Sequence, residues 1–211
     1  MEVIAGGPEV HVVDLRSTQS RGALTSEDRI AEALMRCIAR WGLAKTTIED
    51  LAREAGVSRA TVYRVFPGGK PSIVVHAAHS QVSDLVGLLA LELAEIDQLE
   101  DVLVHAVGTA ATYLEQHEAL AFMRAHEPVL LEQVLGFDRL DALFLAAAEL
   151  IGPALERFLD PSHAREVTIW MTRVIVSYLS TPSELLDLTD PAQVRSFVRS
   201  VVLPGIAAAG D

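Results

Sequence analysis

The chain has 211 residues, of which half are hydrophobic and 22% are charged, a composition that supports a buried core and argues against disorder. Its single cysteine, Cys37, excludes an intramolecular disulfide and a zinc site built from several cysteines. The formal net charge of −12 argues against a general affinity for nucleic acid.

Apolar residues recur at helical spacing along most of the chain, and alternating runs bounded by hairpin turns are absent from the sequence. The fold class is therefore predicted to be all-α. Helices are expected at 26–41, 47–55, 58–66, 71–96, 99–116, 118–125, 128–135, 138–159, 162–180 and 190–203. Ser26 and Asp190 are expected N-caps, and a proline follows Asp190 at the first helical position. Residues 1–22 are interpreted as a flexible N-terminal arm.

The sequence carries no signal for export or for a membrane span. The first ten residues lack a basic segment and a long apolar run. Charge-free apolar stretches such as Leu85–Leu91 and Ala142–Ala148 are far shorter than the roughly 20 residues that cross a bilayer. We therefore expect a soluble, cytoplasmic protein with no membrane partner.

Residues 46–70 contain two short helical segments separated by a tight turn. Thr46 and Glu49 have the spacing of a capping box at the start of the first segment. Gly56 can supply the left-handed backbone conformation that such a turn needs, with Val57 filling the space between the helices. Two short helices joined in this way are typical of the helix-turn-helix of DNA-binding proteins.

The second helical segment is expected to present its first turn to DNA. Ser58 is the expected N-cap, and Val62 and Phe66 fall on the inward face. The same periodicity turns Arg59, Ala60, Tyr63 and Arg64 outward. Residues 26–70 are also the basic part of the chain, with eight Lys and Arg against six Asp and Glu. This local excess suits phosphate contact, although ordinary surface scatter is the alternative.

The stretch resembles the DNA-binding segment of the TetR family of transcriptional repressors. The residues that match the family pattern are Thr46, Thr47, Ile48, Leu51, Ala52, Ala55, Gly56, Val57, Ser58, Thr61, Val62, Tyr63, Phe66 and, after one inserted residue, Lys70. Two positions depart from it, since Ala60 replaces the usual Gly and Val65 replaces the usual His or Tyr. Arg64, beside Val65, could substitute for the missing phosphate donor or could contact guanine.

The resemblance implies which residues bind double-stranded DNA. Thr47, Tyr63 and Lys70 correspond to phosphate-contacting residues, and Thr46 begins the same matched segment. Base reading falls on the first turn of the second helix, at Ser58, Arg59, Ala60 and Thr61. The alternatives remain that Thr47 only caps its helix, that Tyr63 only packs and that Arg59 is a solvated charge.

The resemblance also implies the architecture of the whole chain. A three-helix DNA-binding domain at 23–70 is expected to precede a larger helical domain at 71–211 that binds an effector and forms a homodimer. The low charge within 102–114 and 142–151 favours an apolar effector. The candidate pocket residues are Tyr113, Phe122, Met123, Trp170 and Met171. The candidate dimer residues, on helices 162–180 and 190–203, are Ile169, Arg173, Val176, Tyr178, Val194, Val198 and Val201.

Other kinds of function find less support in the sequence. No nucleophile pattern or acid–base pair is apparent, so we expect no enzyme and no cofactor. His76 and His79 have a spacing compatible with metal binding, but no cysteine or carboxylate cluster completes a site, and we expect no metal. The expected function is a repressor that binds a near-palindromic operator and is released by a small molecule. The alternative is a ligand-binding and dimerisation protein whose DNA-binding module is degenerate.

Overall fold

The computed structural model describes residues 25–134, 137–180 and 186–209, and every regular element in these ranges is helical. The all-α prediction is confirmed. The predicted N-terminal arm lies outside the described residues. The helices are α1 (Ser26–Trp41), α2 (Ile48–Ala55), α3 (Arg59–Val65), α4 (Gly69–Leu93), α5 (Leu99–Gln116), α6 (Glu118–His126), α7 (Pro128–Val134), α8 (Phe137–Leu155), α9 (Pro161–Ser180), α10 (Pro191–Phe197), the π-helical turn η2 (Val198–Val202) and α11 (Leu203–Ala209).

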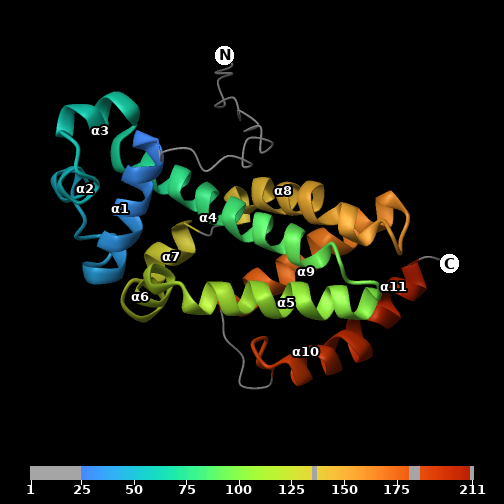
Figure 1. Ribbon diagram of the computed structural model, residues 1–211. Helices are drawn as coiled ribbons and strands as arrows, with labels where there is room; N and C mark the ends of the chain where they lie inside the picture. Colours follow the sequence, from blue (N-terminus) through green and yellow to red (C-terminus); the bar gives the residue numbers. More distant parts are fainter. Residues whose placement is uncertain (1–24, 135–136, 181–185, 210–211) are drawn as a thin grey trace, which may run out of the picture.

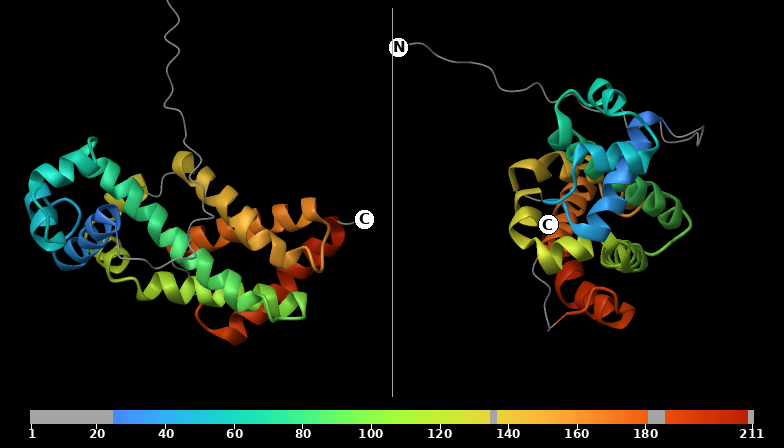
Figure 2. Two further views of the ribbon diagram at one scale, coloured as in Figure 1. Left: turned by 45° about the horizontal axis from the view of Figure 1, so that its top comes forward. Right: turned by 90° about the vertical axis from the view of Figure 1, so that its left-hand side faces the viewer.

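The molecule is elongated, and the first three helices lie together at one end (Figure 1). α1, α2 and α3 form a small lobe, and α4 runs from this lobe into the rest of the chain, where α5, α8 and α9 lie. Figure 2 shows that α11 lies at the end of the molecule opposite this lobe, whereas α10 runs along the body, where it packs against α5. α8 and α9 pack against each other, and α6 packs against α1.

Two large hydrophobic clusters hold the described helices together. The first unites α1, α2 and α3 with the start of α4, and it also includes Ala119 and Met123 of α6 and Leu131 of α7. The second unites the far half of α4 with α5, α9, α10 and η2. The first cluster therefore crosses residue 70, where the sequence predicts a domain boundary. Helices α6 and α7 bury their apolar side chains together with the small lobe.

Two predicted N-caps are wrong by one residue. α1 is capped by Thr25, whose hydroxyl accepts from Asp28 N, and not by Ser26. α2 is capped by Thr47, whose partner in the capping box is Asp50 rather than Glu49. Both boxes use an aspartate, whose shorter side chain reaches the N-cap amide in the same way as the glutamate of the usual pattern. The predicted Asp190 cap is confirmed, because its carboxylate accepts from Ala192 N.

α4 has an unusual combination of length and apolarity. It has 25 residues, and its most apolar window has a mean hydropathy of 1.3, so that by length and composition alone it could cross a membrane. Only 22% of that window is buried, although the helix packs against α1, α5 and α8. Long helices inside soluble proteins meet the same criterion, and here α4 joins the two hydrophobic clusters.

Candidate nucleic-acid interface

The turn between α2 and α3 has the predicted geometry. Gly56 adopts a left-handed conformation with φ of 67°, and Val57 N donates to Ala52 O at 2.9 Å. A side chain at this φ is strained, which explains why the turn needs glycine. Leu51 is fully buried on the inner face of α2, and Val57 packs against the same cluster. The two helices are therefore fixed relative to each other by a short turn and a common core.

α3 presents one face to the core and the other to solvent, as the sequence predicts. Val62 is fully buried, and Phe66, which caps the helix, is 7% exposed. The exposed side chains are those of Arg59, Ala60, Tyr63 and Arg64, and Tyr63 is 46% exposed. Nothing in the described part of the chain covers this face, since Arg59, Ala60, Tyr63 and Arg64 are all accessible. The outward placement of these four residues is confirmed, and their contact with DNA stays a prediction.

The hydroxyl groups around α3 are largely engaged in capping. Ser58 Oγ accepts from Thr61 N at 3.0 Å and lies 3.0 Å from Thr61 Oγ1, so the two predicted base-reading hydroxyls are bonded to each other. Thr47 Oγ1 donates to Asp50 Oδ2 at 2.6 Å while it caps α2. The side chains of Ser58 and Thr47 remain exposed at their helix ends, where backbone N–H groups also point outward. Capping and phosphate contact are compatible at such positions.

Acidic residues of α2 lie close to the interface, and arginines neutralise them. Glu54 accepts from Arg36 Nε at 2.7 Å and from Arg40 Nη1 at 2.9 Å. The hydrogen bond from Arg36 is the largest cause that holds the pKa of Glu54 below its ordinary value. Glu49 forms an ion pair with Arg59 at the start of α3, with 2.5 Å between Oε1 and Nη1. These arginines therefore balance the acidic charge of α2, and the Glu49 carboxylate in turn compensates the charge of Arg59.

Two of the predicted DNA-binding residues face the protein instead. Thr46 is only 2% exposed, and its Oγ1 donates to Gly42 O at 2.7 Å, so the prediction that it contacts DNA is wrong. Lys70 Nζ donates to Leu43 O at 2.6 Å and to Thr46 O at 2.9 Å. Two of its three ammonium protons are thus committed to the loop before α2. Its predicted phosphate contact has at most one donor left.

His76 packs against neighbouring side chains at the start of α4. The His76 ring lies edge-on to Phe66, with 5.3 Å between ring centroids, and its Nε2 is 3.9 Å from Asp28 Oδ1. No group of three or more metal-binding side chains occurs within the described ranges. His76 therefore packs beneath α3, and its Asp28 contact joins α4 to the start of α1.

Comparisons with known proteins agree with this arrangement. The family model for bacterial regulatory proteins of the tetR family matches residues 30–76. An HTH-type transcriptional regulator of Mycobacterium tuberculosis strain H37Rv is 26% identical over 184 residues, which cover 86% of this chain and 88% of that relative. The helix-turn-helix segment of this chain is therefore similar to that of TetR-family transcriptional regulators. A second HTH-type regulator of the same strain is 36% identical over 64 residues, 30% of this chain and 33% of that relative.

Solved structures of TetR-family regulators have the same fold. The repressor AlkX from Dietzia sp. strain DQ12-45-1b, implicated in biodegradation of n-alkanes, superposes with a TM-score of 0.69 at 20% identity. The match covers 89% of this chain and 98% of AlkX. FadR from Bacillus subtilis, solved in complex with stearoyl-CoA, superposes with a TM-score of 0.55 at 17% identity over 82% of this chain and 97% of FadR.

The body of this chain contains an apolar cavity of about 40 Å³. It lies between α4, α5, α8 and α9, and its lining residues are Leu89, Val102, Leu103, Ala106, Val107, Ile151, Leu155, Thr168, Met171, Thr172 and Ile175. The two threonines offer little to a ligand, because Thr168 Oγ1 donates to Ala164 O and Thr172 Oγ1 donates to Thr168 O, both at 2.8 Å. The cavity wall therefore offers a ligand no free hydroxyl donor and presents mainly apolar groups.

Only one of the five predicted pocket residues lines this cavity. Met171 does so, whereas Met123 is buried in the cluster of the small lobe. Phe122 stacks on His126 with 4.4 Å between ring centroids, and Tyr113 OH donates to Gln81 Oε1. Trp170 is 44% exposed on α9. The prediction is wrong for these four as residues of this cavity, since helical periodicity does not reveal which neighbour each face meets.

The predicted dimer residues divide into buried and accessible groups. Val194 and Val198 are fully buried in their own chain, so the prediction that they form an intermolecular seam is wrong. Val176 is also buried, and Tyr178 is half-buried against the second cluster. The accessible members are Val201, Arg173 and, in part, Ile169. Helices α10 and η2 thus bury apolar side chains against α5 of the same chain, and α9 packs mainly against α8.

Proposed function

We propose that this protein is a cytoplasmic, homodimeric TetR-family repressor that binds a near-palindromic operator. The observation that carries the proposal is the exposed first turn of α3, fixed from behind by Val62 and Phe66. A single module of this size contacts few base pairs, and two copies would place their recognition helices about 34–36 Å apart, one turn of DNA. Arg59 and Arg64 are the side chains best suited to guanine or phosphate.

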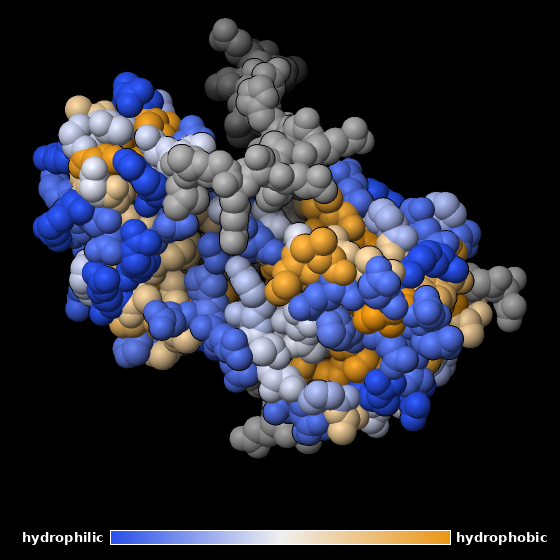
Figure 3. Space-filling view, viewed as in Figure 1, coloured by the Kyte–Doolittle hydropathy of each residue, from blue (hydrophilic) through white to orange (hydrophobic). Residues whose placement is uncertain are grey.

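The dimer would form through α8 and α9. Arg173 of α9 pairs with Asp141 of α8 at 3.7 Å, and its guanidinium lies 4.1 Å from the Phe144 ring centroid. Leu145 is four residues after Asp141, and Trp170 is three residues before Arg173, so both flank this pair on one outer surface. Leu145 is 45% exposed and Trp170 44% exposed. Apolar residues also gather where α4 and α8 lie in the space-filling view (Figure 3). Such exposed apolar side chains favour association.

The effector would be a molecule with an aliphatic chain. The cavity offers apolar walls and no free hydroxyl group, so it can select a hydrocarbon segment but cannot anchor a polar head group. Its volume of about 40 Å³ is too small for a long chain, so binding must separate the surrounding helices. AlkX and FadR, which have this fold, are associated with n-alkanes and with stearoyl-CoA, respectively.

Fluorescence anisotropy tests the proposed DNA binding. Duplexes from upstream of the gene, and duplexes enriched from random sequence, are compared with shuffled duplexes at two salt concentrations. Tight, sequence-selective and salt-sensitive binding is expected, because phosphate contacts release counterions. Equal weak binding to selected and shuffled duplexes would contradict the proposal and favour a degenerate DNA-binding module.

The effector proposal has its own test. Stearoyl-CoA, hexadecanoic acid and n-hexadecane are each titrated into the protein–operator complex, and release is expected from at least one. Ala106→Leu fills the cavity and should abolish release, while Ala90→Leu, at an exposed site on α4, should leave it unchanged. Release from the Ala106→Leu protein at wild-type concentrations would show that the ligand binds elsewhere.

A further inference from the structure

Glu127 forms an unusual contact between the body and the DNA-binding lobe. It lies between α6 and α7, and its backbone N–H donates to Met123 O to end α6. Its carboxylate reaches across to the loop between α1 and α2, where Oε2 accepts from Leu43 N at 2.7 Å and Oε1 accepts from Ala44 N at 3.0 Å. These residues are more than 80 positions apart in the chain. Hydrogen bonds to an ionised acceptor are about twice as strong as neutral ones.

The same loop is held from its other side. Lys70, at the start of α4, donates to Leu43 O and Thr46 O. The amides of the loop are thus bound by an anion from the body, and its carbonyl groups by a cation from α4. Thr47, the next residue, is the N-cap of α2. The position of this loop therefore sets where α2 begins, and the short turn at Gly56 transmits that position to α3.

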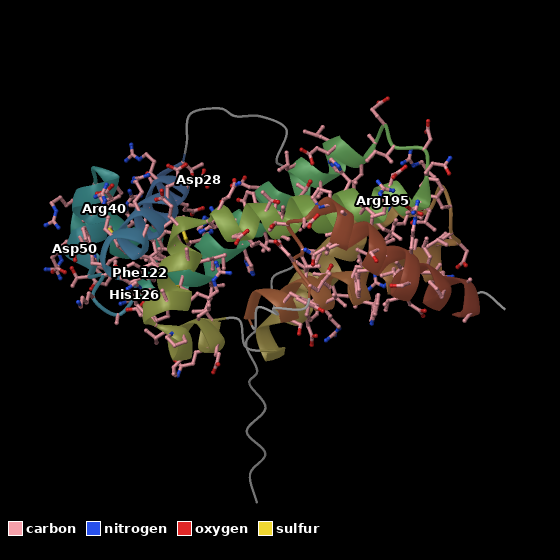
Figure 4. All side chains as sticks on the ribbon, turned by 90° about the horizontal axis from the view of Figure 1, so that it is seen from below. Asp28, Arg40, Asp50, Phe122, His126 and Arg195 are labelled. Carbon is pink, nitrogen blue, oxygen red and sulfur yellow. The ribbon has the colours of Figure 1, made fainter. Side chains whose placement is uncertain are left out.

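The loop between α1 and α2 is closely packed against Glu127 and Phe122, so it has little room to move. Gly42 has φ of 89°, and a Cβ atom there would lie 2.5 Å from Glu127 Oε1 and 2.8 Å from Phe122 Cε1. Phe122 stacks on His126, one residue before Glu127. In the view with side chains, Phe122 and His126 lie beside the lobe that carries Arg40 and Asp50, whereas Arg195 lies at the opposite end of the molecule (Figure 4). The backbone of the loop approaches the body as closely as only glycine allows.

A continuous path joins this contact to the cavity. α5 contributes Val102, Leu103, Ala106 and Val107 to the cavity wall. α5 ends at His117, which is also the N-cap of α6, so the two helices share one residue. His117 Nε2 lies 2.7 Å from Gln81 Oε1 on α4. Glu127 then ends α6. A displacement of α5 by a ligand would therefore act on α6 and on the Glu127 carboxylate.

We propose that Glu127 is the positioning residue through which the body controls the recognition helix. Its two hydrogen bonds hold the α1–α2 loop, and with it α2 and α3, in the arrangement that fits the operator. Withdrawal of the carboxylate, when α6 moves, releases that loop. The effect on operator binding rests on the proposed function, but the restraint on α2 and α3 does not.

The test compares Glu127→Gln with the wild-type protein and with Glu132→Gln, a control at an exposed site on α7. Glutamine keeps the size of the side chain but cannot accept both amides, because its NH₂ group faces one of them. Each protein is examined for melting temperature, oligomeric state, affinity for selected and shuffled duplexes, and amide hydrogen exchange in residues 42–47 and 57–61.

The expected result is faster exchange in both segments of Glu127→Gln and about tenfold weaker binding to the selected duplex. Affinity for the shuffled duplex and the oligomeric state should not change, and Glu132→Gln should resemble the wild type. A loss of melting temperature without loss of selectivity would identify a merely structural contact and overturn the proposal. If the wild-type protein prefers no duplex, the proposed function fails, and amide hydrogen exchange in Glu127→Gln then tests the restraint by itself. Faster exchange confined to residues 42–47 would overturn the restraint on α3. Faster exchange that extends to residues 57–61 would support it.

Discussion

At the scale of single residues, the DNA-facing surface depends on which side chains are already occupied. Arg64 is exposed and has no ion-pair partner within the described ranges, whereas Arg59 is paired with Glu49. Both members of that pair are more than half exposed, so the pair contributes little to folding stability. Its effect is instead to compensate the charge of the arginine that begins the recognition helix. Glu49 is thus a candidate modulator of DNA affinity.

Glu49→Gln should strengthen binding to shuffled DNA. Without the carboxylate, Arg59 is free to contact phosphate, and the slope of log affinity against log salt should steepen by about one. Anisotropy titrations over a range of salt concentrations measure both quantities. Glu32→Gln, on the exposed side of α1, serves as the control for the change in net charge. An unchanged slope would mean that Arg59 does not reach phosphate.

Gly42 and Gly56 offer a second comparison of single residues. Both have positive φ, but a Cβ atom at Gly56 meets open space, whereas at Gly42 it meets Glu127 and Phe122. Gly56→Ala should therefore cost about 1–2 kcal/mol of unfolding free energy, and Gly42→Ala about 3 kcal/mol or more. Urea denaturation of the two variants measures the difference. Equal costs would show that the loop can withdraw from Glu127 without penalty.

At the scale of helices, the junction between α5 and α6 depends on a neutral histidine. His117 Nδ1 accepts from Leu120 N to cap α6, and Nε2 can then donate only as the neutral tautomer, to Gln81 Oε1. Burial is the main cause that lowers the pKa of His117 from its ordinary value of 6.5. A proton on Nδ1 would remove the acceptor that caps the helix. The cap and the interhelical bond therefore exist together only when the ring is uncharged.

Stability should consequently fall in mild acid. Because the folded-state pKa is depressed, the unfolded chain binds the proton first, and the loss begins as pH falls through about 6.5 and is complete below the folded-state pKa. His117→Asn keeps a capping side chain that does not titrate, so its melting temperature should depend less on pH between 8 and 5. Parallel pH dependence in the two proteins would assign the acid sensitivity to other groups.

At the scale of the whole molecule, two hydrophobic clusters joined by α4 determine which surfaces remain for partners. α10 and η2 are attached to α5 by Val194 and Val198 in the core and by Arg195, whose Nη1 lies 2.6 Å from Glu100 Oε1. These helices are therefore part of the fold of one chain. The outer surface of α8 and α9, with Leu145 and Trp170, is left as the better candidate for the dimer seam.

Trp170→Glu should convert the proposed dimer to a monomer. A charge buried in an apolar seam lacks a partner and opposes association, and operator affinity should fall because both half-sites are no longer bound together. Sedimentation velocity and anisotropy measure the two effects. Leu91→Glu, at a site that is 78% exposed on α4, should leave the dimer intact. A dimeric Trp170→Glu protein would place the seam elsewhere.

The sequence by itself determined the all-α class, the α2–α3 turn and the outward face of α3, because each depends on local periodicity, capping and one glycine. It misplaced Thr46 by treating it as the cap, and it could not foresee that Lys70 and Glu127 hold the same loop from opposite sides. Only the tertiary structure decided that Val194 and Val198 face their own chain and that Met171, rather than Phe122, lines the cavity. The physical reason is that an apolar helix face requires burial but does not specify which surface will bury it.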